Sequence, residues 1–162
     1  MITNKTRLKK GLLVFAVFTI VLLILGAGST QITNDKDKVT NLVNQYEKSY
    51  ITFLKDQDLN KLKPFATVKQ LKKIEIYANY FKEQHQTREI NDLISLKIDQ
   101  LKISKESAVV NTLEVWNVRF EDLTTNKVTE QGEGFYKNTF NLVKINGQWL
   151  VDYVNLTEVL KK

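Results

Sequence analysis

The spacing of apolar residues changes twice along this chain. Between Gly11 and Asn34 there is no charged residue, and the stretch at 12–25 (LLVFAVFTIVLLIL) is apolar on every side of a helix. Further on, apolar residues recur every three, four and seven positions, which is typical of one buried helix face. Beyond Arg88 they alternate with polar residues, as in strands. The pattern therefore predicts an apolar segment, then helices, then a sheet.

The apolar segment predicts a transmembrane helix. About 20 apolar residues cross about 30 Å of hydrocarbon, and residues 11–28 come close to that length before the polar Ser29. Residues 1–10 carry four basic side chains and no acidic one, and short basic flanks stay in the cytoplasm. The alternative is a cleaved signal peptide, because a basic start, an apolar run and small residues at 26–28 also fit that pattern.

These flanks define the expected organisation of the chain. We expect a cytoplasmic tail at 1–10, one membrane span at 11–28 and a polar linker at 29–36, followed by an extracytoplasmic domain at 37–162. Leu12 and Leu25 lie near the two ends of the expected membrane anchor. The expected location is the cytoplasmic membrane, crossed once with the N-terminus inside.

Two helices are expected at the start of the domain. The first ends near Gln57, and its apolar face is made of Val39, Leu42, Val43, Tyr46, Tyr50, Phe53 and Leu54. Pro64 marks a break, because the residue before a proline is biased away from helix. The second helix runs from an N-cap at Thr67 to about Gln86. Its core candidates are Leu71, Ile74, Ile76, Tyr77, Tyr80 and Phe81.

Four strands are expected after the helices. The first, around 94–103, changes phase near Asp99 and Gln100, which predicts a bulge and a bend. The next two are expected at 108–123 and 128–145. Asn146-Gly147 is a strong signal for a type I′ hairpin, after which Trp149, Val151 and Tyr153 are expected on one face. The elements predict an α+β domain, with helices on the concave face of a bent antiparallel meander.

These features carry a family resemblance. The helices before the meander, the phase switch and the closing hairpin KINGQWLVDYVNL (144–156) resemble the NTF2-like fold. Within it, the helix LVNQYEKSYITFL and the strand GEGFYKNTFNL are similar to extracytoplasmic NTF2-like domains of Gram-positive membrane proteins of the teicoplanin-resistance (TcaA) kind. The cysteine-rich zinc ribbon of such proteins is absent. A second resemblance is to periplasmic domains of VirB8-type secretion subunits. Both imply an NTF2-like cone outside the membrane.

Charge and cysteine content exclude several classes of function. The net charge of +6 comes mostly from the N-terminal tail, because residues 29–162 hold 20 basic and 18 acidic side chains. So balanced a domain lacks the basic patch that nucleic-acid binding requires, and we expect no nucleic-acid partner. The absence of cysteine excludes disulfides, thiolate metal sites and cysteine nucleophiles.

The titratable residues give little sign of catalysis. His85 is the one histidine and is expected to be a solvated residue at a helix end. Glu114 and Glu121 are expected on opposite faces of their strand, and Asp152 on the water-facing side of the last strand. Phosphate-loop and metal-ligand spacings are absent. We therefore expect no catalytic residue, no cofactor and no metal.

Aromatic residues are the remaining candidates for function. Phe135 and Tyr136 are adjacent in a strand, so that one of them faces away from the core and is a candidate partner contact. The sequence favours a non-catalytic binding or assembly module, with the lipid bilayer and a protein or cell-envelope component as partners and homo-oligomerisation left open. The alternatives are a subunit of a secretion or conjugation machine and an NTF2-like enzyme. A buried carboxylate, or His85, in a pocket would favour the enzyme.

Overall fold

The computed structural model describes residues 34–159. A helix covers residues 34–56 and is followed by a short 3₁₀ turn, η1 (Leu59–Lys61), by α2 (Val68–Tyr80) and by a π-helical turn, η2 (Phe81–His85). Four strands come next: β1 (Thr87–Ile103), β2 (Ser107–Asp122), β3 (Val128–Ile145) and β4 (Gln148–Val159). The predicted membrane span at 11–28 lies outside the described residues. Within 34–159, none of the helices has the length and hydropathy needed to cross a membrane.

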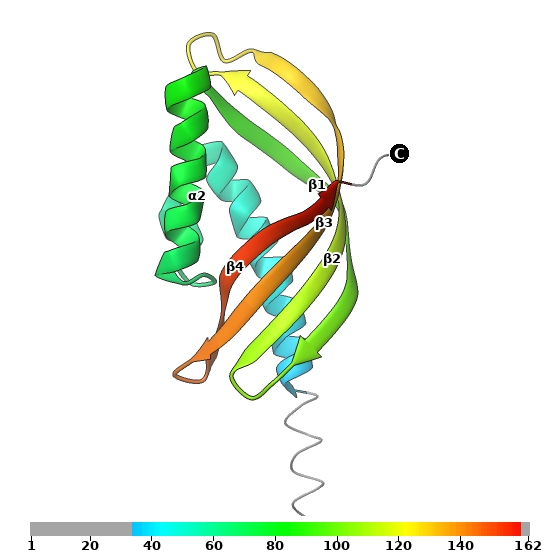
Figure 1. Ribbon diagram of the computed structural model, residues 1–162. Helices are drawn as coiled ribbons and strands as arrows, with labels where there is room; N and C mark the ends of the chain where they lie inside the picture. Colours follow the sequence, from blue (N-terminus) through cyan, green and yellow to red (C-terminus); the bar gives the residue numbers. More distant parts are fainter. Residues whose placement is uncertain (1–33, 160–162) are drawn as a thin grey trace, which may run out of the picture. The chain divides into compact units, whose positions relative to one another are not determined.

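The four strands form one antiparallel sheet in the order β1-β2-β3-β4. Figure 1 shows the sheet curving around the N-terminal helix and α2, which lie on the same concave face. This α+β architecture confirms the expected meander with helices on one side. It is consistent with the NTF2-like cone expected from the sequence.

Local sequence signals account for the helix boundaries. The N-terminal helix stops before Gln57, which adopts a left-handed conformation with φ of 60°. The Thr67 side chain caps α2 by accepting a hydrogen bond from the backbone N–H of Gln70, as predicted. The α-helical part of α2 ends at Tyr80, earlier than expected, because the backbone continues as the π-turn η2.

The curvature of the sheet comes from bulges. The predicted bulge is confirmed, because the register shifts between Ile98 and Gln100. A second shift between Leu93 and Ser95 was not predicted. The extra residue there is Ile94, an apolar residue that is 55% exposed although apolar residues alternate after it in the sequence.

The turn of the closing hairpin forms as predicted, but the residues further along β4 do not keep the predicted alternation of faces. Asn146 and Gly147 have φ of 50° and 80°, the positive values that a type I′ turn needs. Trp149 and Val151 are buried on the concave face. A register shift then makes Asp152 an extra residue, so Tyr153 does not continue their face and the inward positions pass to Val154. The expectation for Tyr153 is therefore wrong.

The core lies between the N-terminal helix and the concave side of the sheet. Its buried apolar side chains come from the helix, from the segment before α2 and from β2, β3 and β4, and include Val39, Val43, Leu54, Leu62, Val110, Phe140, Leu142, Trp149 and Val151. α2 contributes little, because Ile74 is its one buried apolar side chain. Ile76, Tyr77 and Tyr80 are exposed, contrary to expectation, since α2 covers the edge of the sheet and not its centre.

Candidate functional site

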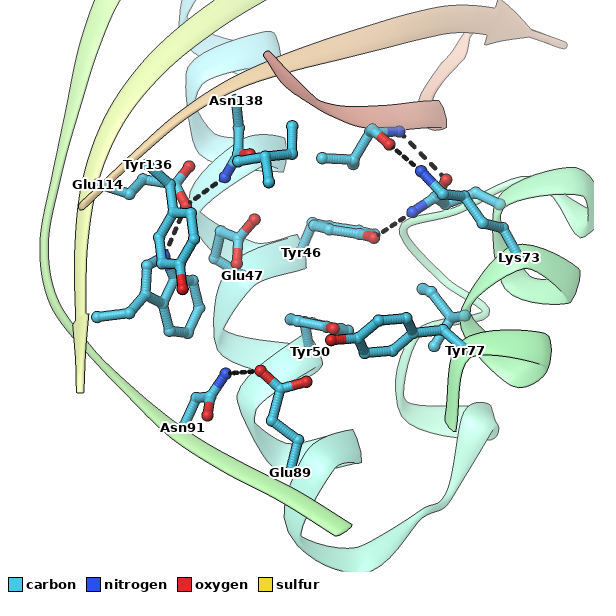
Figure 2. Close-up of a pocket in the computed structure, with 15 residues that line it drawn as sticks. Tyr46, Glu47, Tyr50, Lys73, Tyr77, Glu89, Asn91, Glu114, Tyr136 and Asn138 are labelled. Atoms are coloured by element: carbon cyan, nitrogen blue, oxygen red, sulfur yellow. Dashed lines mark hydrogen bonds between the residues drawn. The ribbon is translucent and has the colours of Figure 1, made fainter. Parts of the chain in front are cut away.

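A cavity of about 280 Å³ lies between the N-terminal helix, α2 and the concave face of the sheet (Figure 2). Three glutamates line it, each from a different element: Glu47 from the N-terminal helix, Glu89 from β1 and Glu114 from β2. The other side chains of the wall are mostly aromatic or amide-bearing and include Tyr46, Tyr50, Gln70, Tyr77, Asn91, Trp116, Tyr136 and Asn138. The cavity thus combines negative charge with aromatic surface.

The Glu114 carboxylate is fixed by three donors. Trp116 Nε1 and Asn138 Nδ2 each donate to Glu114 Oε2 over 2.8 Å, and the Thr112 hydroxyl donates to Oε1. Glu114 is 2% exposed. Residues 112, 114 and 116 share the inward face of β2 by alternation, so the strand builds this network locally. A buried charge with several hydrogen bonds is the arrangement that folded proteins tolerate.

Glu47 is buried without such support. Its side chain is 3% exposed, and its Oε2 atom has no hydrogen-bond partner among the described residues. Burial, followed by the negative charge of Glu114, raises the pKa of Glu47 well above its usual value of 4.5. In Figure 2 the carboxyl group of Glu47 lies between Tyr46 and Tyr136. Glu47 therefore lines the cavity with a carboxyl group whose Oε2 atom is left without a hydrogen bond among the described residues.

Glu89 repeats this arrangement at the β1 side of the cavity. Asn91 Nδ2 donates to Glu89 Oε1, while Oε2 is buried and has no partner in the described part of the chain. Asn91 is itself held by a 3.3 Å hydrogen bond from the backbone N–H of Arg119 to its Oδ1 atom. Glu47 and Glu89 therefore each have one buried carboxyl oxygen without a partner among the described residues, and Glu89 also interacts with the side chain of Tyr77.

The surroundings of the tyrosines further disfavour their ionised form. Burial is the largest cause that raises the pKa of Tyr46, Tyr50 and Tyr77, and nearby glutamates add to it. The Tyr46 hydroxyl accepts a 2.6 Å hydrogen bond from Gln70 Nε2. The Tyr136 ring lies over Gly134, where even a Cβ atom would come within 2.2 Å of the ring. Gly134 thus makes room for the Tyr136 ring.

The α2 wall is held to β4 by polar contacts. Gln70 joins the two elements, because its Oε1 accepts from the backbone N–H of Val154 at 3.2 Å while its Nε2 donates to Tyr46. Lys73 also lines the cavity, but its ammonium group donates to the Val154 carbonyl and lies 4.0 Å from the centre of the Tyr153 ring. Lys73 is therefore engaged along the edge strand.

Asp152 fastens the start of α2. Its carboxylate accepts from the Thr67 hydroxyl at 3.0 Å and from Lys69 Nζ at 2.7 Å. The hydrogen bond from Lys69 is the main cause that lowers the pKa of Asp152. The sequence placed this residue on a water-facing side, whereas the bulge in β4 turns it toward α2.

The other residues singled out in the sequence fall in different places. His85 is exposed at the end of η2, as expected, beside the rings of Tyr80 and Phe81 and outside the cavity lining. Glu121 pairs with Arg88 at 2.8 Å and is separate from Glu114, as the strand parity predicted. Tyr136 faces the cavity, so Phe135, by alternation, belongs to the convex face. The role of Phe135 and Tyr136 in partner contact stays a prediction.

Sequence reasoning missed Glu47 and Glu89 as cavity residues. Glu47 lies four positions after Val43 and seven before Leu54, which places it on the buried stripe of the helix. This spacing was the signal in the sequence that could have identified Glu47 as a buried residue. Glu89 alternates with Asn91, but both are polar, and so this part of β1 was not recognised as strand. Within residues 34–159, no three His, Cys, Asp or Glu side chains are grouped so that they could hold a metal ion.

Comparison with known proteins gives a likeness of fold. No protein-family model and no curated protein matches the chain. The intermembrane space region of the chloroplast protein ARC6 is similar, with a TM-score of 0.62 and 16% identity over 74% of this chain and 94% of that one. This likeness shows the fold alone.

Two bacterial structures are more distant. One is an NTF-2-like protein of unknown function from Shewanella oneidensis MR-1, with a TM-score of 0.47 and 14% identity over 76% of this chain and 99% of that one. The other is a putative Ca/calmodulin-dependent kinase II association domain from Exiguobacterium sibiricum 255-15, with a TM-score of 0.48 and 10% identity over 79% and 95%.

Proposed function

We propose that this protein is a membrane-anchored binding module that takes a ligand into the cavity without changing it chemically. The observation that carries the proposal is Glu47, which lines the cavity and whose buried Oε2 atom has no partner among residues 34–159. Buried polar atoms in folded proteins are nearly always hydrogen-bonded, because leaving one unpaired costs about 1–3 kcal/mol. A bound ligand that forms the missing hydrogen bond would explain why this atom is retained.

The location that we propose is the outer face of a bacterial cytoplasmic membrane. It is supported by the apolar segment at 11–28 and by the basic residues before it. There, the module would hold a cell-envelope component, as the sequence resemblance to TcaA-type domains implies, or other copies and protein subunits, as the resemblance to VirB8-type secretion subunits implies. These two roles differ in whether the cavity or the sheet surface meets the partner.

The membrane part of the proposal is tested by a reporter fusion. Alkaline phosphatase, which is active only outside the cytoplasm, is joined after Lys162. We expect an active fusion with the natural tail and a marked loss when Lys5, Arg7, Lys9 and Lys10 are replaced by glutamate. Activity of a cytoplasmic reporter at the same position would contradict the proposed orientation.

The binding part is tested by photocrosslinking in native membranes. A photoreactive amino acid replaces Tyr77, which is partly exposed and lines the cavity, or Ile76, its more exposed neighbour on α2 that is not part of the lining. We expect a discrete adduct from position 77 and none from position 76. Equal labelling at both positions, or none at either, would contradict a ligand site in this cavity.

An acid–base enzyme is the second candidate. The observation that favours it is the pair of buried carboxyl groups, Glu47 and Glu114, which line one cavity and interact electrostatically. Two carboxyls in different environments are a recurring arrangement for proton transfer. The candidates are separated by mass spectrometry of the ligand captured at position 77. An unchanged ligand after incubation with the full chain supports the binding module, whereas conversion that stops in the Glu114→Gln variant supports the enzyme.

A further inference from the structure

Two carboxyl oxygens of the cavity wall have no hydrogen-bond donor among the described residues. Glu47 Oε2 and Glu89 Oε2 are both buried and unpaired within residues 34–159, and both glutamates line the cavity. By contrast, Glu114 is satisfied by its three donors. A ligand with N–H groups can complete both oxygens, provided that Glu47 loses its proton when the ligand binds. A ligand rich in acceptors, such as a carboxylate or a phosphate, would meet like charge.

The charge of the wall favours a cation. Three glutamates line the cavity, and Lys73 is the one basic side chain in the described lining. The Lys73 ammonium group is already taken up by the Val154 carbonyl and the Tyr153 ring. In a cavity partly closed to water, charges interact more strongly than at an open surface. Glu47 keeps its proton in the empty cavity, and the positive charge that would balance its ionised form is left for a ligand to supply.

The aromatic part of the wall suits the same ligand. Tyr50, Tyr77 and Tyr136 line the cavity together with Trp116. In Figure 2, Tyr50 and Tyr77 come from the two helices and Tyr136 from the opposite side, on β3. The faces of aromatic rings attract cations and also pack against hydrocarbon stems. A volume of about 280 Å³ has room for a small molecule of this kind.

We propose, resting on the proposed function, that the ligand is a small organic cation with N–H groups, such as the ammonium end of an amine. Its N–H groups donate to Glu47 and Glu89, and its hydrocarbon stem lies against the tyrosine rings. A quaternary ammonium has the charge without the donors, and an alcohol has one donor without the charge. Both should bind more weakly than the amine.

Binding should then be coupled to a proton. The charged and titratable groups around Glu47 come from every neighbouring element: Glu89 on β1, Glu114 on β2, Tyr136 on β3, Lys73 and Tyr77 on α2, and Tyr46 and Tyr50 on its own helix. Because burial and Glu114 raise the pKa of Glu47, this residue holds its proton in the empty cavity until the pH passes that pKa. A bound cation favours the ionised form, so binding releases a proton and the affinity rises with pH.

The experiment uses the full chain in detergent micelles and n-butylammonium as the probe. The chain has two tryptophans, which give two indole N–H signals in a ¹H–¹⁵N spectrum. Trp116 lines the cavity and donates to Glu114, whereas Trp149 lies in the apolar core. We expect butylammonium, at millimolar concentration, to shift the Trp116 signal and leave the Trp149 signal in place. Butanol and tetramethylammonium should bind at least about tenfold more weakly.

Two variants make the test specific. Glu47→Gln keeps the shape of the side chain and removes its charge, and we expect it to lower the butylammonium affinity about tenfold or more. Glu106→Gln removes the same charge from an exposed turn and should leave the affinity unchanged. Equal affinities for butylammonium and butanol, or a Glu47→Gln variant that binds as the natural chain does, would overturn the inference. If either result is found while crosslinking at position 77 still captures a ligand, the proposed binding function is retained and the proposal that the ligand is a cation is wrong.

Discussion

The two ends of the concave face are built from the same strands and serve different purposes. Near the closing hairpin, Phe140 and Leu142 of β3 pack with Trp149 and Val151 of β4 against the N-terminal helix, and none is more than 5% exposed. Two and four residues before Phe140 on the same face, β3 carries Asn138 and Tyr136 and the packed core gives way to a cavity. One alternation thus runs through both regions, and only the side-chain chemistry changes.

The energetic roles of the two ends are opposite. Burying apolar area stabilises the fold by about 25 cal/mol per Å², so the hairpin end supplies much of the stability. At the cavity end, a carboxyl group without a partner costs free energy. Sites that destabilise a fold in this way are typical of function, because evolution retains them despite the cost. The comparison predicts that substitutions at the two ends change stability in opposite directions.

The largest effect is expected at the packed end. Replacing Trp149 by alanine removes a side chain that is 5% exposed and should destabilise the protein by about 3–5 kcal/mol. Urea unfolding of the full chain in detergent, followed by near-ultraviolet circular dichroism, measures this loss. The conservative Trp149→Phe change should cost clearly less. A Trp149→Ala variant as stable as the natural chain would place the core elsewhere.

At the cavity end, Glu47→Gln should stabilise the protein at neutral pH. The folded-state pKa of Glu47 is raised, so the folded chain holds a proton that the unfolded chain releases. Stability therefore falls as the pH rises from the ordinary value of 4.5 toward the raised one. The amide cannot ionise, and we expect a gain of about 1–3 kcal/mol at pH 8 and little at pH 4. A loss at pH 8 would contradict the account.

The pH range in which Asp152 affects stability is separate from that of Glu47. The pKa of Asp152 is lowered, chiefly by Lys69, so its contribution to stability is present above the ordinary aspartate value of 3.8 and is lost below it. Asp152→Asn should therefore weaken the protein at neutral pH and flatten the acid side of the profile. Stability is measured from pH 2 to pH 9 for both variants. Asp152→Asn should change the acid side of the curve, and Glu47→Gln should change the part above pH 4.5.

A smaller effect is expected at the glycines of β3. A Cβ at Gly134 would come within 2.2 Å of the Tyr136 ring, whereas one at Gly132 would meet nothing within 4 Å. Because the end of a tyrosine side chain can move, Gly134→Ala should cost about 1 kcal/mol or less and displace the ring from the cavity wall. The displacement should weaken butylammonium binding, with Gly132→Ala as the matched control. Equal butylammonium binding in both variants would show that Tyr136 does not contribute to the site.

The smallest effect is expected at His85. This residue is exposed at the end of η2 and lies outside the cavity lining. His85→Ala should change stability by no more than about 0.5 kcal/mol and leave ligand binding unaltered. Thermal unfolding and the Trp116 signal measure the two quantities. Loss of binding in this variant with an intact fold would point to a different site.

The hairpin end could be predicted from the sequence, and the cavity end could not. Asn146-Gly147 and the alternation of Trp149 with Val151 identify a turn and a buried face by rules that act over a few residues. The bulge near Asp99 was also visible as a change of phase. In contrast, the bulges at Ile94 and Asp152 leave no phase signal, because polar and apolar residues are mixed around them.

The cavity depends on contacts between residues far apart in the sequence. Glu47, Glu89 and Glu114 come from three elements and meet only because the sheet curves around the helix. The position of Glu47 on the helix matches the buried stripe, but it was not recognised, because a single glutamate there is usually interpreted as an interruption of that stripe. Strand parity correctly separated Glu114 from Glu121, but it could not show that Glu114 would meet a glutamate from the N-terminal helix. The sequence does not show which residues from different elements meet in the folded protein, and the cavity depends on these contacts.

The central claim is that Glu47 is a buried acid held without a partner and ready for a cation. It is tested most directly by the side-chain ¹³C carboxyl signal of Glu47 in the full chain, followed as a function of pH with and without butylammonium. We predict that the Glu47 signal titrates well above 4.5 in the empty protein and at a lower pH when the amine is bound. A Glu47 signal that titrates near 4.5 and does not respond to the amine would contradict this account of the cavity.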